Sequence, residues 1–278
     1  MRRTTASIIK MKRDGEKIPM LTAYDYPTAK TLDELSIPMI LVGDSLGMVV
    51  LGYESTVYVT MDDMVHHTRA VARGAKRSLI IADMPFMSYR QGRQEALKNA
   101  ARLLQEGGAQ AVKLEGGESV AETLHHIVEN GVPVMGHIGL TPQSVNQLGG
   151  YRIQGKTPEK AAQLLRDAKA LEDAGAFSIV LECVPAPLAR LITERVSVPT
   201  IGIGAGVHCD GQVQVINDIL ATCPDFTPRH TRIYASIGDA TAEAVAAYRD
   251  DVRDSLFPTD KQSFTMAPGV LSELMQYA

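Results

Sequence analysis

Cysteine is scarce in this sequence of 278 residues. There are three, Cys183, Cys209 and Cys223, and no two of them form a Cys-x-x-Cys pair. An odd number in this spacing argues against a disulfide framework and against a thiolate zinc site. We therefore expect a protein of a reducing compartment, the cytoplasm.

Long runs of one charge sign and long apolar runs are also absent. The 28 basic and 32 acidic side chains are interspersed and give a formal net charge of −4, which leaves no electrostatic footprint for nucleic acid. The basic N-terminus lacks the unbroken apolar region of a signal peptide, and no later stretch is long enough to cross a bilayer. We expect a small-molecule ligand, with no nucleic-acid or membrane partner.

The sequence is rich in short apolar runs that alternate with longer amphipathic stretches. This alternation is typical of buried parallel strands joined by helical crossovers. The predicted strands are residues 19–23, 39–43, 78–82, 111–114, 132–136, 177–181, 199–203 and, more weakly, 215–220.

Helix signals lie between these strands. Thr60 can cap a helix that ends near residue 74, Thr157 opens one that ends near residue 175, and Ser119 with Glu122 forms a capping-box pattern. We see no interdomain linker and predict one domain over residues 1–278. Its less regular ends are an N-terminal extension of residues 1–18 and a helical tail of residues 240–278, where TAEAVAAYRDDVRDSL predicts an amphipathic helix.

Polar residues at strand ends decide between the two folds that this rhythm allows, an open doubly wound sheet and a closed barrel. In an open sheet they gather at one switch point, whereas in a barrel they follow nearly every strand. Ionisable residues stand at the ends of five successive predicted strands: Asp44, Asp83, Lys113 with Glu115, His137, and Glu182. We therefore predict an α/β protein, a closed (β/α)8 barrel with its site at the carboxyl ends of the strands.

Asp44, Asp83 and Glu115 would converge at the mouth of such a barrel. Three carboxylates close together require a cation, and ligation by oxygen alone suits a hard ion such as Mg²⁺. Each acid taken alone could instead be a helix cap or a solvated loop charge. We predict metal ligands because the strand pattern brings the three together.

Lys113 and His137 would line the same cavity. Lys113 lies two residues before Glu115 and so shares its face of the strand. It would be a partly buried cation for a substrate carboxylate or oxo group, or a structural ion-pair partner of Glu115 or Asp83. His137 is either a substrate contact or a hydrogen-bonding filler.

Glu182 ends an otherwise apolar strand. Burial there would disfavour its charged form and make it a stronger base, as removal of a proton from a weakly acidic C–H bond requires. The alternative is a carboxylate paired with Arg152 or Arg195, which the sequence leaves open.

Two further patterns carry no predicted catalytic role. The IGIGAGV stretch fails the dinucleotide pattern GxGxxG, because Cys209 occupies the third glycine position, and it is either a ligand-contacting loop or a tight turn. Adjacent side chains on a helix point apart, so the two His-His pairs do not make a site. We interpret six histidines as surface or packing residues: His66, His67, His125, His126, His208 and His230.

Several longer blocks resemble the ketopantoate hydroxymethyltransferase family over nearly the whole chain. They are LTAYDYPTAK, LVGDSLGMVVLGYEST, ADMPFMSY, AVKLEGG, GHIGLTPQSVNQLGGYRIQGK, VLECVP and IGIGAG. The resemblance implies a barrel related to the phosphoenolpyruvate mutase and isocitrate lyase group, which binds Mg²⁺ and a 2-oxo acid at the strand ends. It also implies a cytoplasmic homo-oligomer, often a decamer.

Matched position by position, the resemblance gives each residue a role. The metal ligands are Asp44, Asp83 and Glu115. The oxo-acid contacts are Asp44, Ser45, Asp83, Lys113 and His137. Glu182 is the proton acceptor, which removes the C3 proton of 3-methyl-2-oxobutanoate to give an enolate that Mg²⁺ stabilises. The enolate attacks the one-carbon unit of the co-substrate 5,10-methylenetetrahydrofolate, and water completes 2-dehydropantoate for pantothenate synthesis.

The match is not complete, and two rival functions stand beside it. Tyr58 stands where the family usually has Pro, and His230 replaces a usual aromatic residue. A C–C lyase or mutase of the phosphoenolpyruvate mutase and isocitrate lyase type is one rival, although the KKCGH-like loop of the cysteine-dependent lyases is missing. A catalytically silent metal-binding barrel is the other.

Overall fold

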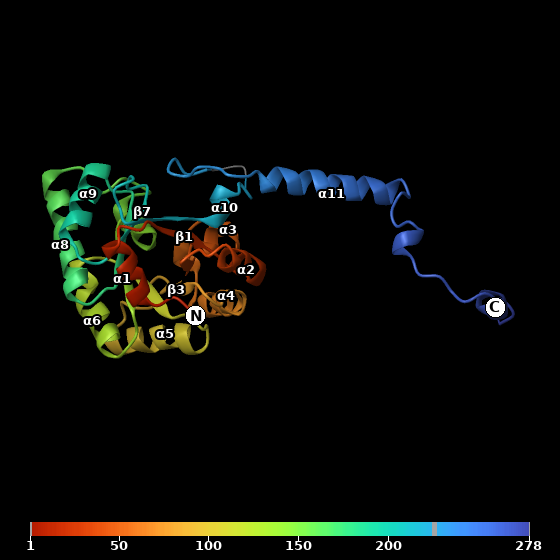
Figure 1. The fold of residues 1–278 in the computed structure, drawn as a ribbon, viewed down its shortest axis with the longest axis horizontal. Helices are drawn as coiled ribbons and strands as arrows, with labels where there is room; N and C mark the ends of the chain where they lie inside the picture. Colours follow the sequence, from red (N-terminus) through yellow and green to blue (C-terminus); the bar gives the residue numbers. More distant parts are fainter. Residues whose placement is uncertain (1, 224–226, 278) are drawn as a thin grey trace.

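Eight parallel strands close into a barrel in the computed structural model, which describes residues 2–223 and 227–277 (Figure 1). Each strand pairs with its sequence neighbours, and β8 pairs with β1 to close the sheet. The predicted (β/α)8 barrel is therefore confirmed. The strands are β1 (Ile18–Thr22), β2 (Met39–Val42), β3 (Leu79–Asp83), β4 (Ala111–Glu115), β5 (Val134–Gly139), β6 (Ser178–Glu182), β7 (Thr200–Ile203) and β8 (Gly211–Gln214).

Helices precede, connect and follow the strands. The α-helices are α1 (Thr5–Arg13), α2 (Tyr26–Glu34), α3 (Leu46–Val49), α4 (Met61–Gly74), α5 (Arg93–Gln105), α6 (Ala121–Glu129), α7 (Val145–Leu148), α8 (Pro158–Asp173), α9 (Ala186–Arg195), α10 (Ile216–Ile219), α11 (Ile237–Arg253) and α12 (Val270–Leu274). Short 3-10 turns are η1 (Thr56–Tyr58), η2 (Glu118–Val120), η3 (Pro142–Ser144) and η4 (Asp260–Gln262). None of the helices in the described ranges is both long enough and apolar enough to span a membrane.

Seven of the predicted strands lie within three residues of their predicted bounds, and the eighth prediction is wrong. The apolar residues at 215–220 form the short helix α10, and the last strand is the preceding segment, β8. Gly211 and Gln212 interrupt the apolar pattern of that strand. Gly211 is required by packing, because a Cβ there would lie 2.2 Å from the carbonyl oxygen of Ile18 on β1.

Two of the three predicted helix starts are confirmed. Thr60 caps α4 and Thr157 caps α8, each through its side-chain oxygen. The capping box at residues 119–122 is wrong, because that segment runs from η2 into α6, which has no side-chain cap. A contact from α8 fixes the turn instead, since Asp167 Oδ1 accepts a 3.0 Å hydrogen bond from the backbone N–H of Glu118.

The amino-terminal end of the barrel is filled by apolar side chains. Residues 1–18, expected to be less regular, contain helix α1, whose Ile8 and Met11 are buried in one cluster with inward-facing residues such as Met20, Met39 and Ile201. A second apolar layer joins the strands to the surrounding helices. Since one end of the barrel is packed, the polar site lies at the other.

Helix α11 extends away from the barrel (Figure 1). The helix predicted for residues 241–256 is confirmed, although it starts and ends a few residues earlier. None of its residues is buried, and it carries exposed Ile237, Val245, Tyr248 and Val252. Tyr248 packs edge-on against Phe257, and the barrel buries none of these apolar side chains.

Candidate active site

A cavity of about 590 Å³ opens at the carboxyl ends of the strands. The structure brings all seven predicted site residues together on its wall: Asp44, Ser45, Asp83, Lys113, Glu115, His137 and Glu182. Their convergence is a property of the fold, while their individual roles remain predictions.

Strand register accounts for this convergence. Asp83 lies opposite Lys113 across β3 and β4, and Glu115 lies opposite His137 across β4 and β5. Lys113 and Glu115 both line the cavity, as their two-residue spacing predicts. Lys113 Nζ lies 3.1 Å from Asp83 Oδ1, so the ion pair that we considered as an alternative role for Lys113 is present.

The three predicted metal ligands are neither helix caps nor solvated charges. Asp44, Asp83 and Glu115 are each at most 4 % exposed. The backbone N–H of Asp44 donates a 3.0 Å hydrogen bond to Asp83 Oδ2, which holds the ends of β2 and β3 together. The alternative interpretation of these acids as caps or surface charges is therefore wrong.

The electrostatics of the cluster favour a further cation. Burial raises the pKa of Asp44 to about 7, and the charge of Asp83 contributes to the increase. Burial likewise raises the pKa of Glu115 well above its usual range. Burial alone would lower the pKa of Lys113, but the charges of Asp83, Glu115 and Asp44 outweigh it and raise that pKa. One ammonium thus faces three carboxylates.

The donor set fits a hard divalent cation. All three acids offer oxygen, and Asp83 Oδ1 is buried and makes no hydrogen bond with the described residues, although it lies 3.1 Å from the Lys113 ammonium. Over residues 2–223 and 227–277, no three His, Cys, Asp or Glu side chains already stand in a metal-binding arrangement. Closing around an ion therefore requires these carboxylates to turn.

His137 links the acid cluster to Glu182. Burial, and then the charge of Lys113, lower the pKa of His137, so the imidazole is neutral. Its Nδ1 lies 3.2 Å from Lys113 Nζ and accepts from that ammonium, which leaves the ring proton on Nε2. Nε2 lies 3.3 Å from Glu182 Oε2, in a contact without good hydrogen-bond geometry.

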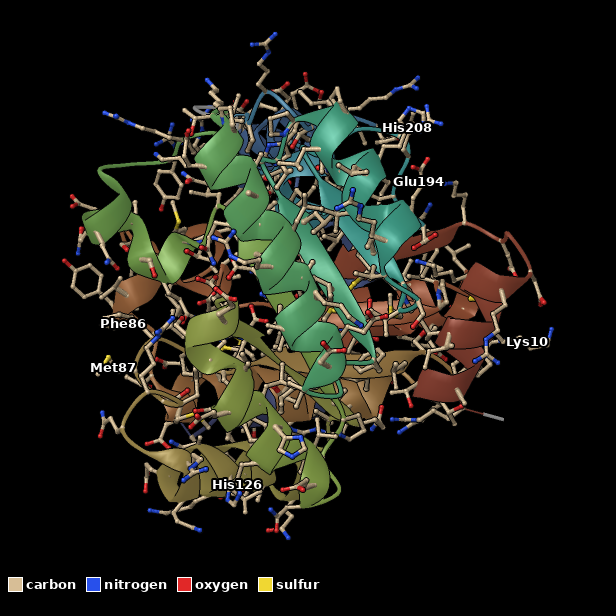
Figure 2. The ribbon with its side chains drawn as sticks, turned by 90° about the vertical axis from the view of Figure 1, so that its left-hand side faces the viewer. Lys10, Phe86, Met87, His126, Glu194 and His208 are labelled. Carbon is tan, nitrogen blue, oxygen red and sulfur yellow. The ribbon has the colours of Figure 1, made fainter. Side chains whose placement is uncertain are left out.

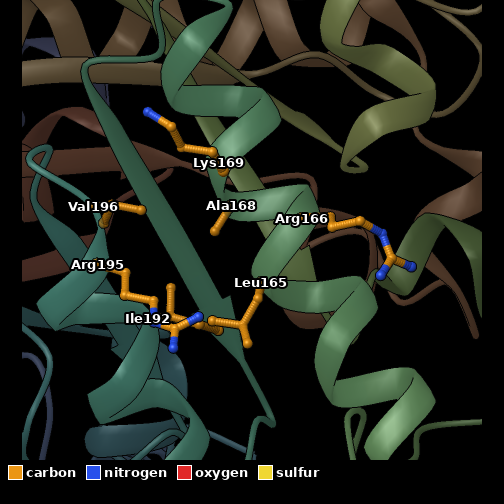
Figure 3. A pocket seen from close by; sticks show the side chains of 7 residues that line it. All are labelled: Leu165, Arg166, Ala168, Lys169, Ile192, Arg195 and Val196. Atoms are coloured by element: carbon orange, nitrogen blue, oxygen red, sulfur yellow. The ribbon is translucent and has the colours of Figure 1, made fainter.

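Glu182 is the most accessible acid of the predicted set, with 16 % of its side chain exposed. Neither arginine proposed as its partner forms an ion pair with it in the described part of the chain. Arg152 is an exposed residue of the cavity wall. Arg195 lies elsewhere, in a groove of about 360 Å³ between α8 and α9 on the outside of the barrel (Figure 3). Glu182 is therefore free to act on a ligand.

The outer groove lacks the chemistry of the cavity. It is lined by Leu165, Arg166, Ala168, Lys169, Ile192, Arg195 and Val196 (Figure 3). These side chains include no acid and no histidine, so the groove offers no base for proton removal.

Sequence reasoning missed Gln143, which ties the acids together from η3. It is 4 % exposed, and its Nε2 donates to Asp44 Oδ2 at 2.8 Å and to the carbonyl of Met84 at 3.0 Å. Its backbone N–H donates to Glu115 Oε2 at 3.0 Å. The hydroxyl of Tyr89, also missed, donates to Gln143 Oε1 at 2.7 Å. An amide in the block LTPQS gives no chemical signal of this role, which depends on three strand ends meeting.

Ser45 and His230 also line the cavity. Ser45 Oγ lies 2.8 Å from the hydroxyl of Tyr24, which fixes the serine at the cavity rim. His230, expected to be a surface or packing residue, lines the cavity. Its side chain lies beside Gly204, where a Cβ would approach it to 3.3 Å. Gly204 and Gly206 both have positive φ, so the backbone bends after β7, and Ile203 of the same stretch lines the cavity.

Most of the remaining histidines agree with the expectation. His208 is exposed, and His126 on α6 is half-buried with its Nε2 inaccessible (Figure 2). His67 is a packing residue whose Nδ1 lies 2.7 Å from the carbonyl oxygen of Tyr24. Tyr58, the other departure from the family pattern, is exposed and packs edge-on against Tyr53.

The sequence as a whole matches a known family. The family described as Ketopantoate hydroxymethyltransferase matches residues 2–260. The chain belongs to this family. It is 60 % identical to the 3-methyl-2-oxobutanoate hydroxymethyltransferase of Dehalococcoides mccartyi (strain CBDB1) over 274 residues, which cover 99 % of this chain and 98 % of the relative. The same-named protein of Acetivibrio thermocellus is 56 % identical over 271 residues, 98 % of this chain and 96 % of the relative. As a member of the family, the chain is a hydroxymethyltransferase.

Solved structures of distant sequence share the fold. A 2,3-dimethylmalate lyase, described as a member of the PEP mutase/isocitrate lyase superfamily, has a TM-score of 0.60 at 16 % identity and covers 100 % of this chain and 98 % of its own. A phosphonopyruvate hydrolase in complex with oxalate and Mg²⁺ has a TM-score of 0.59 at 13 % identity, covering 99 % and 98 %. At such identity the likeness shows the barrel fold alone.

Proposed function

We propose that the chain transfers a hydroxymethyl group from 5,10-methylenetetrahydrofolate to 3-methyl-2-oxobutanoate and gives 2-dehydropantoate, a precursor of pantothenate. The observation that carries this proposal is one cavity that joins a buried carboxylate cluster, a buried ammonium and a more accessible carboxylate. The name of the relatives supplies the identity of the oxo acid.

Asp44, Asp83 and Glu115 would hold Mg²⁺. Three observations support this assignment. The acids offer only oxygen donors, three carboxylates face one ammonium, and a solved structure of the same fold is a complex with Mg²⁺. When bound, Mg²⁺ supplies the positive charge that stabilises the enolate oxygen of the oxo acid.

Gln143→Leu is expected to weaken binding of Mn²⁺, used as a probe for the Mg²⁺ site, by about 10- to 100-fold. The variant removes the amide that holds Asp44, while the leucine fills a similar volume. Electron paramagnetic resonance of free Mn²⁺ measures the affinity without any turnover. Gln105→Leu, at an exposed position on α5, is the control. Wild-type affinity in Gln143→Leu would show that the amide does not position the ligands.

The oxo acid would be held by the chain's own polar groups. The ammonium of Lys113 is charged and reaches the cavity, where it can bind an anionic oxygen of the substrate. Ser45 offers a hydroxyl at the rim, on the side of Asp44. These contacts would place C3 of the acid toward the accessible Glu182.

Glu182 would act as the base. Its carboxylate accepts the proton from C3, and the resulting carbanion forms a bond to the one-carbon unit of the folate. The bonds from that carbon to the two folate nitrogens break, water supplies the hydroxyl oxygen, and the nitrogens take up the protons from water and from C3, which leaves tetrahydrofolate. The neutral His137 beside Glu182 adds no charge that would oppose this proton transfer. The test is formation of 2-dehydropantoate from both substrates with Mg²⁺, followed by mass spectrometry. Folded, metal-loaded protein that gives no product would overturn the proposal.

We also propose that the chain acts in the cytoplasm as a homo-oligomer, a decamer. The three cysteines are unpaired, as a reducing compartment favours. The exposed apolar residues of α11 are of the kind that pack against another chain.

Deletion of residues 237–278 is therefore expected to lower the oligomeric state while leaving the barrel folded. The deleted segment contributes no buried residue among those described, so the thermal unfolding of the barrel should change little. Analytical ultracentrifugation of the full chain and the truncated chain measures the assembly, and circular dichroism checks the fold. A truncated chain that keeps the same number of subunits would assign assembly to another surface.

A further inference from the structure

The cavity extends beyond the proposed oxo-acid site toward β8. One end carries the acid cluster and Lys113, and the other is lined by Ile203, Val213, Val215, Asp218 and His230. A volume of this size is typical of pockets that enclose ligands much larger than a small oxo acid. The β8 end therefore has room for the second, larger substrate.

Asp218 is the acid of that end, and nothing in the described chain satisfies it. Its carboxylate forms no hydrogen bond or ion pair with any described residue, and burial alone raises its pKa to about 6. A half-buried carboxylate that no protein group satisfies is open to hydrogen bonds from water or from a ligand in the cavity. Asp218 differs in this from Asp44, which Gln143 satisfies.

Hydrogen bonds to neighbouring segments fix the position of the helix that carries Asp218. The helix that carries it, α10, is anchored to the end of β1 because the backbone N–H of Ile216 donates to Thr22 Oγ1 at 3.0 Å. On the same helix, the carbonyl of Ile219 accepts from the backbone N–H of Tyr234 at 2.8 Å. Residues 216–219 thus stand between the barrel and the following segment.

The facing segment is also fixed to the barrel. Gln214, the last residue of β8, accepts at Oε1 from Thr231 Oγ1 at 3.1 Å and donates through Nε2 to the carbonyl of His230 at 3.4 Å. His230 and Asp218 line the same end of the cavity. The helix that carries Asp218 is hydrogen-bonded to β1, and the segment that carries His230 is hydrogen-bonded to β8.

The donor pattern that fits Asp218 is found on the pterin ring of a folate. The pyrimidine half of that ring carries an amino group next to a ring N–H, both pointing the same way like two arms of a guanidinium. A carboxylate accepts such a pair in a bidentate manner. The apolar side chains of Ile203, Val213 and Val215 offer contact for the flat faces of the ring.

We propose that Asp218 binds the pterin ring of the folate co-substrate, accepting hydrogen bonds from its amino group and the adjacent ring N–H. This inference rests on the proposed function, since it names the binding site of that reaction's one-carbon donor. The oxo acid then occupies the Lys113 end and the folate the β8 end of one cavity, with Glu182 lining the same space.

The test compares Asp218→Asn and Asp218→Ala with wild type in three measurements. The first is the Kd for tetrahydrofolate by isothermal titration calorimetry, the second is the KM for the methylene-bearing folate co-substrate, and the third is C3 proton exchange of the oxo acid in D2O without folate. Loss of charge-assisted hydrogen bonds should raise both constants by about 10- to 100-fold. Exchange should stay near the wild-type rate, which also shows that the variants are folded. Asp173→Asn on the exposed face of α8 is the control.

The outcomes separate the two proposals. Wild-type affinity for tetrahydrofolate in both variants would overturn the pterin site. Exchange that falls as far as product formation would also overturn it, because Asp218 would then act on the oxo acid or on the fold. If wild type binds tetrahydrofolate but shows neither exchange nor product, the proposed reaction fails, and weaker binding by the variants still supports the pterin site.

Discussion

Glu182→Gln is expected to lower the rate of C3 proton exchange of 3-methyl-2-oxobutanoate in D2O by about 10²- to 10⁴-fold, in the presence of Mg²⁺ and without folate. An amide of the same shape cannot accept the proton, and the neighbouring acids are poorly placed to replace it. Glu115 and Asp44 are almost fully buried and bonded to Gln143. Product formation with folate should fall by a similar factor.

The substitution should leave the fold and the oxo-acid contacts intact. Glu182 makes no ion pair with an arginine of the described chain, and its contact with His137 is a loose one that an amide can keep. Proton NMR of the C3–H signal follows the exchange, and a wild-type Kd for the oxo acid shows that binding persists. Glu194→Gln on the outside of α9 (Figure 2), where the glutamate pairs with Arg190, is the matched control. Exchange at the wild-type rate in Glu182→Gln would assign the base to another group.

The convergence of the ionisable strand-end residues could be predicted from the sequence, because a closed parallel barrel places all carboxyl ends of its strands at one rim. Parallel strands with all carboxyl ends at one rim bring Asp83, Lys113 and Glu115 together whatever the connecting helices do. Apolar runs bounded by polar residues therefore indicated both the fold and the position of the site. The seven predicted residues needed no tertiary information beyond closure of the sheet.

The sequence pattern missed β8, Gln143 and Asp218, because contacts between distant segments determine their roles. The strand β8 has no apolar run, since Gly211 is fixed by its approach to Ile18 rather than by periodicity. Gln143 acts through four hydrogen bonds to residues of other segments. Asp218 stands out only once its lack of a partner in the described chain is known. Local pattern carries no information about these long-range contacts.

Lys113→Met is expected to lower the free energy of unfolding of the metal-free protein by about 3–5 kcal/mol at pH 8. The variant keeps most of the side-chain volume but removes the one ammonium that faces three buried carboxylates. Urea unfolding in the presence of a chelator measures the loss. Lys169→Met is the matched control, because that lysine is 58 % exposed and pairs with Glu172 and Asp173 on the surface of α8. The control should lose at most about 1 kcal/mol.

The loss at Lys113 should depend on pH in a defined direction. The folded-state pKa of Asp44 is about 7, above the value of about 3.9 for an unfolded chain, so the folded state binds the extra proton and stability falls as pH rises between these values. The charge of Lys113 lowers the pKa of Asp44 and of Glu115, and without it both rise further. In the variant Asp44 is protonated at pH 5 at little cost. At pH 8 the folded variant must either keep a proton that the unfolded chain releases or carry an unpaired buried charge, so the variant should lose less stability at pH 5. An equal loss at both values would mean that packing of the lysine stem, and not its charge, stabilises the barrel mouth.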